Sequence, residues 1–186
     1  MLVDEDDERG AVLQEALAEA GYRVVARLRN EENLAVAVRE YKPDMVIIDM
    51  EAPGRDTLEQ MREVSRDNPK PIVLFSNNRD SEYIRQAVRA GVSAYVVDGL
   101  SRDRILPIVE VAMARFSEFQ VLRRELEDTR ARLADRKLVE KAKGLLMKHR
   151  GLSEDEAYQS LRKTAMARNQ RIVDVARMLL ALEEFL

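Results

Sequence analysis

The chain has 186 residues, of which 46% are hydrophobic and 35% charged, so it has enough core-forming residues for one ordinary domain and a smaller helical unit and is not a disordered polypeptide. It has no cysteine and one histidine, His149, which excludes disulfides, thiolate nucleophiles and multi-histidine metal sites. It shows no long apolar run and no signal-peptide pattern, so we expect a cytoplasmic protein without a membrane span.

The first part of the chain, to about residue 115, alternates short apolar runs with helical patterns, which is typical of repeated βα units. Five strands are predicted, at residues 2–3, 22–28, 45–48, 72–75 and 94–97. The third and fourth are continuously apolar, which indicates burial on both faces and a doubly wound five-stranded parallel sheet. Chemistry gathers at the carboxyl ends of such strands. The residues there are Asp4, Glu5, Asp49, Ser76 and Asp98.

A long helical pattern follows, from about residue 105 to residue 147, with Pro107 expected in its first turn. Apolar side chains recur in it at three- and four-residue spacing among dense charges, at Phe119, Leu122, Leu126 and Leu133, with Thr129 at an equivalent position. This pattern favours a short coiled-coil seam and therefore a homodimer. The alternative is a single amphipathic helix lying on the first domain.

The remaining residues are expected to form a small all-α domain of three helices. The first helix ends near Gly151, the second begins at Ser153 with Glu156 three residues later as a capping box, and the third begins after Asn169. The predicted division is residues 1–108 for the α/β domain, 109–135 for a coiled-coil linker and 136–186 for the helical domain.

Charge is distributed unevenly between these parts. Residues 1–134 contain 20 Lys and Arg against 26 Asp and Glu, whereas residues 135–186 contain 11 against 8. The concentration of basic charge near the carboxyl end points to a polyanionic partner. A solvated helix face without a partner is the alternative.

The α/β part resembles the response-regulator receiver domain, through Leu2-Val3-Asp4-Glu5, through Val46 to Met50 with Pro53, through Phe75-Ser76 and through Ala94-Tyr95. The resemblance implies that Asp49 is a phospho-acceptor and that Asp4 and Glu5, with Asp49, hold Mg²⁺. It also implies that Ser76 senses the phosphoryl group and that Tyr95 is the rotating aromatic residue. These roles fit the chemistry, because phosphoryl transfer to a carboxylate needs a nucleophile and a cation that neutralises the transferring oxygens.

One departure from the receiver pattern concerns the end of the fifth strand, where the family has lysine followed by proline and this chain has Asp98-Gly99. Loss of that positive charge disfavours a phosphoryl group. We therefore hypothesise that phosphorylation of Asp49 is weak or dispensable, and that a protein partner or ligand-controlled sequestration sets the activity instead. The expected protein partner is a sensor kinase or a sequestering sensor protein.

The carboxyl-terminal part resembles the ANTAR domain of the amidase and nitrate-assimilation antiterminators, through residues 138–147, residues 153–158, Leu161-Arg162, Ala165-Met166 and residues 174–176. The resemblance implies binding to paired stem-loops in mRNA leaders and transcription antitermination. Basic side chains in this part can contact phosphates and stack on unpaired bases. The predicted RNA-binding residues are Lys141, Lys143, Gly144, Arg162, Lys163, Arg168 and Arg171.

Two other classes remain as alternatives to an RNA-binding regulator. Three short helices also fit a helix-turn-helix DNA-binding domain, but the third is poor in the Arg, Asn and Gln expected of a recognition helix. A signalling adaptor that binds only proteins is the other alternative. Enzymatic turnover is not expected, since the chain lacks cysteine and a phosphate-cradling glycine loop, and beyond Mg²⁺ no cofactor is predicted.

Overall fold

The computed structural model describes residues 1–29, 32–51, 53–97 and 102–183. It divides into two compact units, Met1–Gln120 and Val121–Leu186. One helix, α5 (Arg102–Arg150), contributes residues to both units.

The first unit alternates strands and helices as the sequence predicts. Its elements are β1 (Leu2–Asp4), α1 (Asp7–Glu19), β2 (Arg27–Leu28), α2 (Leu34–Tyr41), β3 (Val46–Asp49), α3 (Arg55–Asp67), β4 (Ile72–Phe75), α4 (Ser81–Arg89), β5 (Ala94–Val96) and the start of α5. All strand pairs are parallel and the order across the sheet is β2-β1-β3-β4-β5. The predicted doubly wound five-stranded sheet is therefore confirmed.

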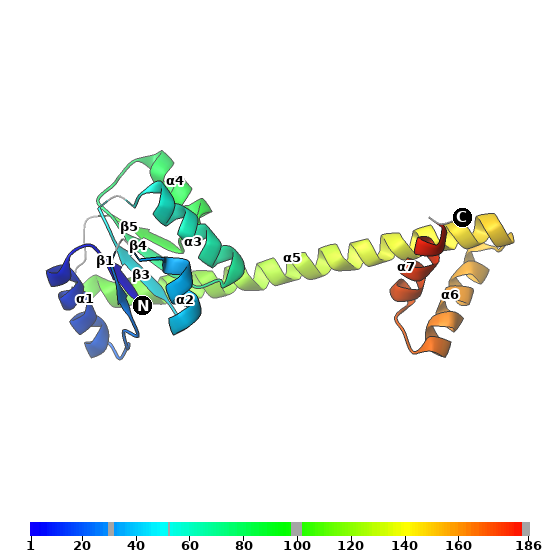
Figure 1. Ribbon diagram of the computed structural model, residues 1–186, viewed down its shortest axis with the longest axis horizontal. Helices are drawn as coiled ribbons and strands as arrows, with labels where there is room; N and C mark the ends of the chain where they lie inside the picture. Colours follow the sequence, from blue (N-terminus) through cyan, green and yellow to red (C-terminus); the bar gives the residue numbers. More distant parts are fainter. Residues whose placement is uncertain (30–31, 52, 98–101, 184–186) are drawn as a thin grey trace. The chain divides into compact units, whose positions relative to one another are not determined.

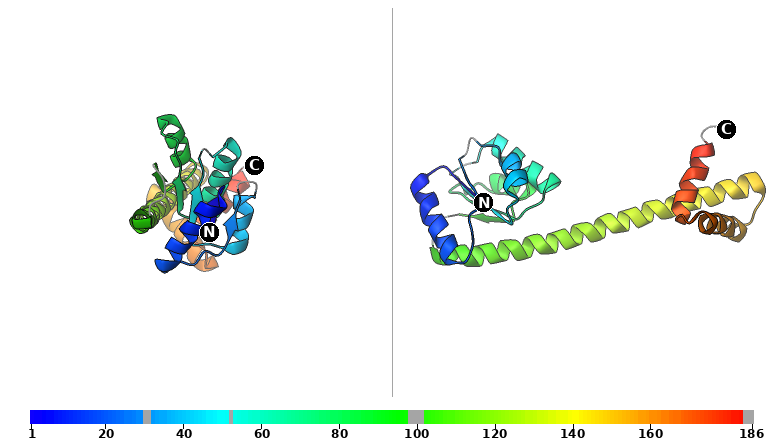
Figure 2. Two further views of the ribbon diagram at one scale, coloured as in Figure 1. Left: turned by 90° about the vertical axis from the view of Figure 1, so that its left-hand side faces the viewer. Right: turned by 60° about the horizontal axis from the view of Figure 1, so that its bottom comes forward.

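Two apolar layers cover the sheet, one on each face (Figure 1). One layer joins α2, α3 and α4 to the sheet through residues such as Val38, Met61 and Ala87. The other joins α1 and α5 through Leu13 and Val109, and Figure 2 shows these two helices together on that face. Burial of β3 and β4 by both layers explains their continuous apolar sequences.

Strand β2 differs from its prediction, because the structure forms a strand at Arg27–Leu28 and not from residue 22. An edge strand is limited by its neighbour, and β1 is three residues long. Its Leu2 and Val3 pair with Arg27 and Leu28, so the preceding residues have no ladder partner. Tyr22 packs instead against the apolar layer shared by α1 and α5.

The second unit contains three helical segments, namely the end of α5, α6 (Glu154–Arg168) and α7 (Ile172–Glu183). The predicted capping box is present, since Ser153 Oγ accepts a hydrogen bond from the Glu156 amide while the Glu156 carboxylate accepts one from the Ser153 amide. Asn169 ends α6 in the left-handed conformation. A separate small core joins the segments, formed by Ala142, Leu146, Ala157, Leu161, Ala165, Val175 and Ala176.

Helix α5 is longer than predicted at both ends. It begins at Arg102, so Pro107 lies beyond the first turn and not in it as the sequence predicts. Proline has no amide proton to donate to the carbonyl four residues earlier, but the helix continues through this position. The predicted arrangement of a receiver-like sheet, a long helix and a three-helix domain is confirmed.

Candidate functional site

Three predicted site residues meet at the carboxyl edge of the sheet. Register places Asp4 opposite Asp49, and Asp49 opposite Phe75, so that Ser76 follows at the same edge. All three polar side chains are buried, with exposed fractions of 3% for Asp4, 8% for Asp49 and 4% for Ser76. A buried acid at a strand end needs a partner, which makes this edge a candidate for chemistry.

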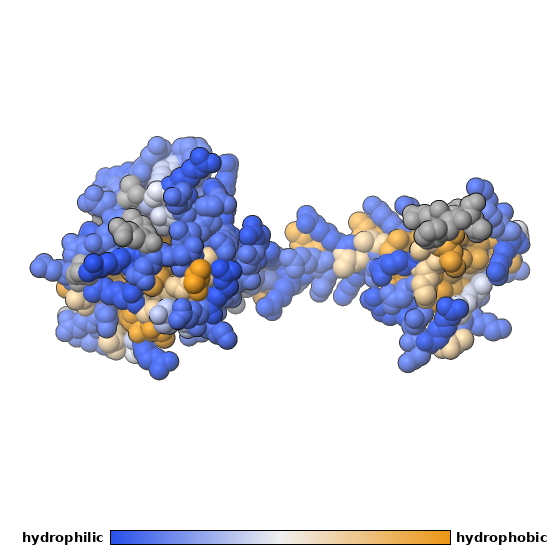
Figure 3. Space-filling model, viewed as in Figure 1, coloured by the Kyte–Doolittle hydropathy of each residue, from blue (hydrophilic) through white to orange (hydrophobic). Residues whose placement is uncertain are grey.

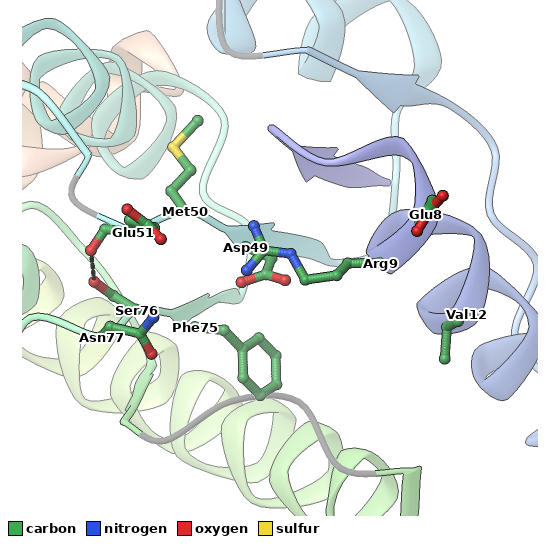
Figure 4. Close-up of a pocket in the computed structure, with 9 residues that line it drawn as sticks. All are labelled: Glu8, Arg9, Val12, Asp49, Met50, Glu51, Phe75, Ser76 and Asn77. Carbon is green, nitrogen blue, oxygen red and sulfur yellow. Dashed lines mark hydrogen bonds between the residues drawn. The ribbon is translucent and has the colours of Figure 1, made fainter.

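A pocket of about 400 Å³ opens at this edge (Figure 4). Its polar lining comes from the first turn of α1 and from the ends of β3 and β4, and consists of Glu8, Arg9, Asp49, Glu51, Ser76 and Asn77. Figure 4 shows the side chain of Arg9 reaching across the pocket toward the carboxylate of Asp49. The pocket thus combines acidic groups with a guanidinium.

Burial raises the pKa of the Asp49 carboxyl above its ordinary value, because desolvation penalises the charged form. The positive charge of Arg9 acts in the opposite direction and is the next largest influence, while the negative charges of Asp4, Asp6 and Glu5 raise the pKa further. Asp49 is therefore a carboxylate that gains from any additional positive charge placed beside it.

Asp4, opposite Asp49 at this edge of the sheet, carries a carboxylate oxygen without a hydrogen-bond partner. Its Oδ1 accepts a hydrogen bond from the Asp6 amide at 2.7 Å, whereas its buried Oδ2 has no hydrogen-bond partner. A buried carboxylate oxygen beside a second carboxylate suits Mg²⁺, which takes one or two carboxylates and completes its coordination with water and phosphate oxygens. Asp4 and Asp49 therefore fit such an ion.

The predicted metal-binding set is not assembled in full. Glu5 is exposed at the surface. Among the residues that the structure describes, no three His, Cys, Asp or Glu side chains gather into a metal-binding group. The arrangement supplies two acidic ligands rather than three.

Ser76 and Tyr95 both contact the loops around the pocket. Ser76 Oγ donates a hydrogen bond to the Glu51 carbonyl oxygen at 2.6 Å and accepts one from the Asn78 amide at 3.2 Å. Tyr95 donates its hydroxyl proton to the Asn78 carbonyl oxygen at 2.7 Å and packs edge-on against Tyr83. Both predicted residues are thus linked to the loop after β4. The predicted site residue Asp98 lies outside the described residues.

Sequence reasoning missed Arg9 and Asp6. Asp6 is the N-cap of α1, accepting hydrogen bonds from the Glu8 and Arg9 amides at 2.9 Å and 3.2 Å. An aspartate directly before a helical pattern is the signal for such a cap. The first turn after a parallel strand lies at the edge of the sheet where that strand ends, which is the signal that would have placed Arg9 in the pocket.

The predicted RNA-binding residues of the second unit fall into two groups. Lys141, Gly144, Arg162, Lys163 and Arg168 are exposed. Lys143 is buried, and its ammonium group lies 2.8 Å from Glu140 Oε2 and 2.7 Å from Glu154 Oε1, so it links α5 to α6. Arg171 is exposed but donates two hydrogen bonds to Asp174 in the first turn of α7.

Gly144 lies in the interior of α5, and its surroundings are open. A β-carbon built at this position would meet no heavy atom within 4 Å. The glycine is therefore not required by a tight helix crossing within the domain.

The apolar seam expected on α5 is exposed. Phe119, Leu122, Leu126 and Leu133 have exposed fractions of 60%, 58%, 50% and 54%. Figure 3 shows apolar residues (orange) at the surface of α5 among hydrophilic neighbours. These side chains are available to another helix.

Comparison with known families assigns both units. Residues 1–110 match the model of the response regulator receiver domain, and residues 127–180 match that of the ANTAR domain. The chain belongs to the ANTAR response regulators. It is 33% identical over 168 residues to the transcriptional regulatory protein PdtaR of Mycobacterium tuberculosis, which covers 90% of this chain and 82% of PdtaR.

Further relatives of this ANTAR response regulator match parts of it. The nitrate regulatory protein of Klebsiella oxytoca is 42% identical over 80 residues, covering 43% of this chain and 19% of that protein. A LuxR-family response regulator from Aurantimonas sp. SI85-9A1 superimposes with a TM-score of 0.54 at 25% identity, covering 65% of this chain and 96% of that one. A receiver domain from Desulfovibrio desulfuricans G20 gives 0.53 at 22% identity, covering 62% and 94%, and supports the fold.

None of the helices in the described part of this response regulator combines the length and apolar character needed to cross a membrane. The receiver match ends at residue 110 and the ANTAR match begins at residue 127, both within α5. The domain limits expected after residues 108 and 135 stay predictions.

Proposed function

We propose that this response regulator is a transcription antitermination factor whose ANTAR domain binds stem-loops in mRNA leaders, and whose receiver domain and coiled coil control dimerisation and output. Two relatives carry the names transcriptional regulatory protein and nitrate regulatory protein, which supports a role in gene regulation. The match to the ANTAR domain over residues 127–180 favours RNA over the other polyanions.

The observation that carries the proposal is the set of exposed cations on α6. Arg162, Lys163 and Arg168 form no ion pair within the described residues, so their charges are available to phosphates. Tyr158, one turn before Arg162 on the same helix, is 42% exposed. An exposed ring near guanidinium groups suits unpaired bases, which proteins reach in loops because the major groove of A-form RNA is too narrow.

The same geometry argues against a helix-turn-helix that reads DNA. A recognition helix presents several polar side chains to base edges. In its described residues α7 carries a single basic side chain, Arg177, which lies 3.4 Å from Asp174 and 3.9 Å from Asp135. Basic charge is concentrated on α6 instead.

The exposed seam on α5 supports a homodimer. Four large apolar side chains in water favour pairing with a second copy, since a seam of this spacing is what two helices bury in a coiled coil. Two ANTAR domains in one assembly would engage two stem-loops, and the second contact would be strengthened by its high effective concentration.

In the receiver, Asp49 would accept a phosphoryl group from a sensor kinase, and Asp4 and Asp49 would hold Mg²⁺. The ion would neutralise charge on the transferring oxygens. Because residue 98 is an aspartate, we keep the hypothesis that this phosphorylation is weak or dispensable and that a sequestering sensor protein can replace it.

Titration of the full chain against a two-stem-loop leader RNA, a scrambled RNA and duplex DNA, each over a salt series, tests the proposal. We expect tight binding to the structured RNA that survives salt better than binding to the other two, since nonspecific electrostatic binding falls steeply with salt. The variant Arg162→Ala should bind the structured RNA more weakly. Arg89→Ala, on α4 of the receiver, is its control, because it removes the same single positive charge and should leave RNA affinity unchanged. Equal affinity for all three nucleic acids would refute the proposed function.

A further inference from the structure

The pocket around Asp49 contains a cation that the proposed function does not use. Arg9 lines the pocket with Asp49 and Ser76, and its guanidinium is directed at the Asp49 carboxylate (Figure 4). It belongs to α1, as does the lining residue Glu8, whereas the other polar groups of the pocket come from the ends of β3 and β4. Arg9 is the basic side chain among the residues that line this pocket.

The backbone of Arg9 is held firmly at this position. Asp6 caps the first turn of α1 by accepting hydrogen bonds from the Glu8 and Arg9 amides. Arg27 reaches over the same turn and donates a hydrogen bond to the Asp6 carbonyl oxygen at 3.1 Å. Its guanidinium fills the space that a β-carbon at Gly10 would need, so glycine next to Arg9 permits this contact.

The side chain of Arg9, by contrast, is 45% exposed and able to adjust. Its Nε lies 3.5 Å from Asp6 Oδ2, which is a loose ion pair. Arg9 is the cation with the largest influence on the pKa of Asp49 among the described residues. Residue 98, at the end of β5 in the sequence, is an aspartate and supplies no positive charge.

A phosphoryl group on Asp49 would place additional anionic oxygens in this pocket. A guanidinium offers several N–H donors in one plane and binds such oxygens in pairs, which makes arginine well suited to phosphate groups. The buried Oδ2 of Asp4, which pairs in register with Asp49, has no hydrogen-bond partner and would attract a metal ion and not an anion. The metal ion and the anionic oxygens would therefore bind to different groups.

We infer that Arg9 is the positioning residue that binds the oxygens of a phosphoryl group carried by Asp49. The inference rests on the proposed role of Asp49 as phospho-acceptor. In the transfer, an Asp49 carboxylate oxygen forms a bond to phosphorus while the bond from phosphorus to the donor's leaving group breaks. With phosphoramidate as donor, the leaving nitrogen takes a proton from water and departs as ammonia.

This role predicts that removing Arg9 affects the binding of anions and of cations differently. Arg9 and a divalent cation compete for the charge of Asp49, so removing Arg9 should leave Mg²⁺ affinity unchanged or raise it. Removing Arg9 should weaken a phosphoryl-like anion, because a charged hydrogen-bond donor is lost. A residue that merely supports the fold would change both affinities in the same direction.

The test compares the full chain with Arg9→Ala, Arg9→Lys and the control Arg66→Ala. Arg66 is an exposed side chain of α3 that pairs with the neighbouring Asp67 and does not line the pocket. Mg²⁺ alone is titrated by calorimetry, and beryllium trifluoride, a phosphoryl mimic, is titrated by fluorine NMR in saturating Mg²⁺. Thermal melts followed by circular dichroism show whether each variant is folded.

We expect Arg9→Ala to weaken beryllium trifluoride binding by about tenfold or more, with Mg²⁺ affinity equal or higher. Arg9→Lys should lose less, because a point charge remains without the paired donors. The control should match the parent chain.

Equal affinity for beryllium trifluoride in Arg9→Ala and the parent would overturn the inference, as would a parallel loss of affinity for beryllium trifluoride and for Mg²⁺. If the parent chain binds no beryllium trifluoride, or if Asp49→Asn binds it as well as the parent does, the proposed role of Asp49 fails together with that of Arg9. Failure of Arg9 alone is recognised by beryllium trifluoride binding that depends on Asp49 and not on Arg9.

Discussion

Replacement of Gly144 by alanine should stabilise the ANTAR domain while weakening its binding to RNA. Glycine in a helix interior costs about 1 kcal/mol relative to alanine. Nothing lies within 4 Å of the added β-carbon, so the substitution meets no steric penalty in the protein itself. For a unit of this size, about 1 kcal/mol corresponds to a rise of roughly 4–8 °C in the melting temperature.

The effect on RNA binding has the opposite sign if the bare backbone at Gly144 lies against the ligand. An added methyl group in a closely packed contact costs about 1–3 kcal/mol, which weakens binding by roughly 5- to 150-fold. Lys141, three residues before Gly144, is exposed on the same helix and can hold a phosphate close to that backbone.

Two measurements decide this prediction, a thermal melt and a titration with the two-stem-loop RNA. Ala134→Gly, at an exposed position earlier in α5, is the matched control and should lower stability without changing RNA affinity. A more stable Gly144→Ala protein with unchanged RNA affinity would refute close approach by the ligand. A less stable protein would refute the open environment of Gly144.

Four further changes test other parts of the molecule. Lys143→Met should lower the melting temperature of the ANTAR domain at neutral pH; the pKa of Glu154 is held below its ordinary value by the Lys143 ammonium, so the stabilisation it gives is lost as the pH falls, and the difference between the two proteins should narrow in acid. Arg162→Ala should weaken RNA binding by about tenfold and reduce the dependence on salt concentration by about one ion, with an unchanged melt. Asp49→Asn should raise the melting temperature at neutral pH, because burial raises the pKa of Asp49 and makes its charged form unfavourable; the gain should disappear in acid, where the carboxyl is protonated in both the folded and unfolded states, and a constant difference across pH would contradict this cause. Leu126→Arg should weaken self-association by about tenfold or more in analytical ultracentrifugation, and an unchanged mass at all concentrations would count against the seam.

The order and type of most elements could be predicted from the sequence. Periodicity identified the helices, and the apolar runs of β3 and β4 identified the centre of the sheet, because burial on both faces leaves little freedom in residue type. The capping box at Ser153 placed the start of α6 correctly for the same local reason. Strand β2 was predicted too long, since strand length depends on the partner and the short β1 is not visible in the sequence of residues 22–28.

The site was predicted less completely than the fold. Asp4, Asp49 and Ser76 could be placed because parallel strands end at one edge of a sheet. Arg9 could not, because its role depends on the direction of one long side chain. In the sequence, Lys143 cannot be distinguished from the other basic residues near it. In the structure its ammonium group is paired with Glu140 and Glu154, and Glu154 belongs to another helix, so the pairing could not be predicted from the local sequence.

The apolar layer shared by α1 and α5 makes the two helices dependent on each other. Leu13 and Leu17 of α1 belong to the same close-packed cluster as Ile105 and Val109 of α5, and packed interiors tolerate little change in volume. A larger side chain on one helix requires a smaller one on the other. Across the relatives of this chain, the sizes of the side chains at these positions should therefore covary. Substitutions in α1, the helix that carries Arg9, should be accompanied by substitutions in α5, the helix that leads to the ANTAR domain.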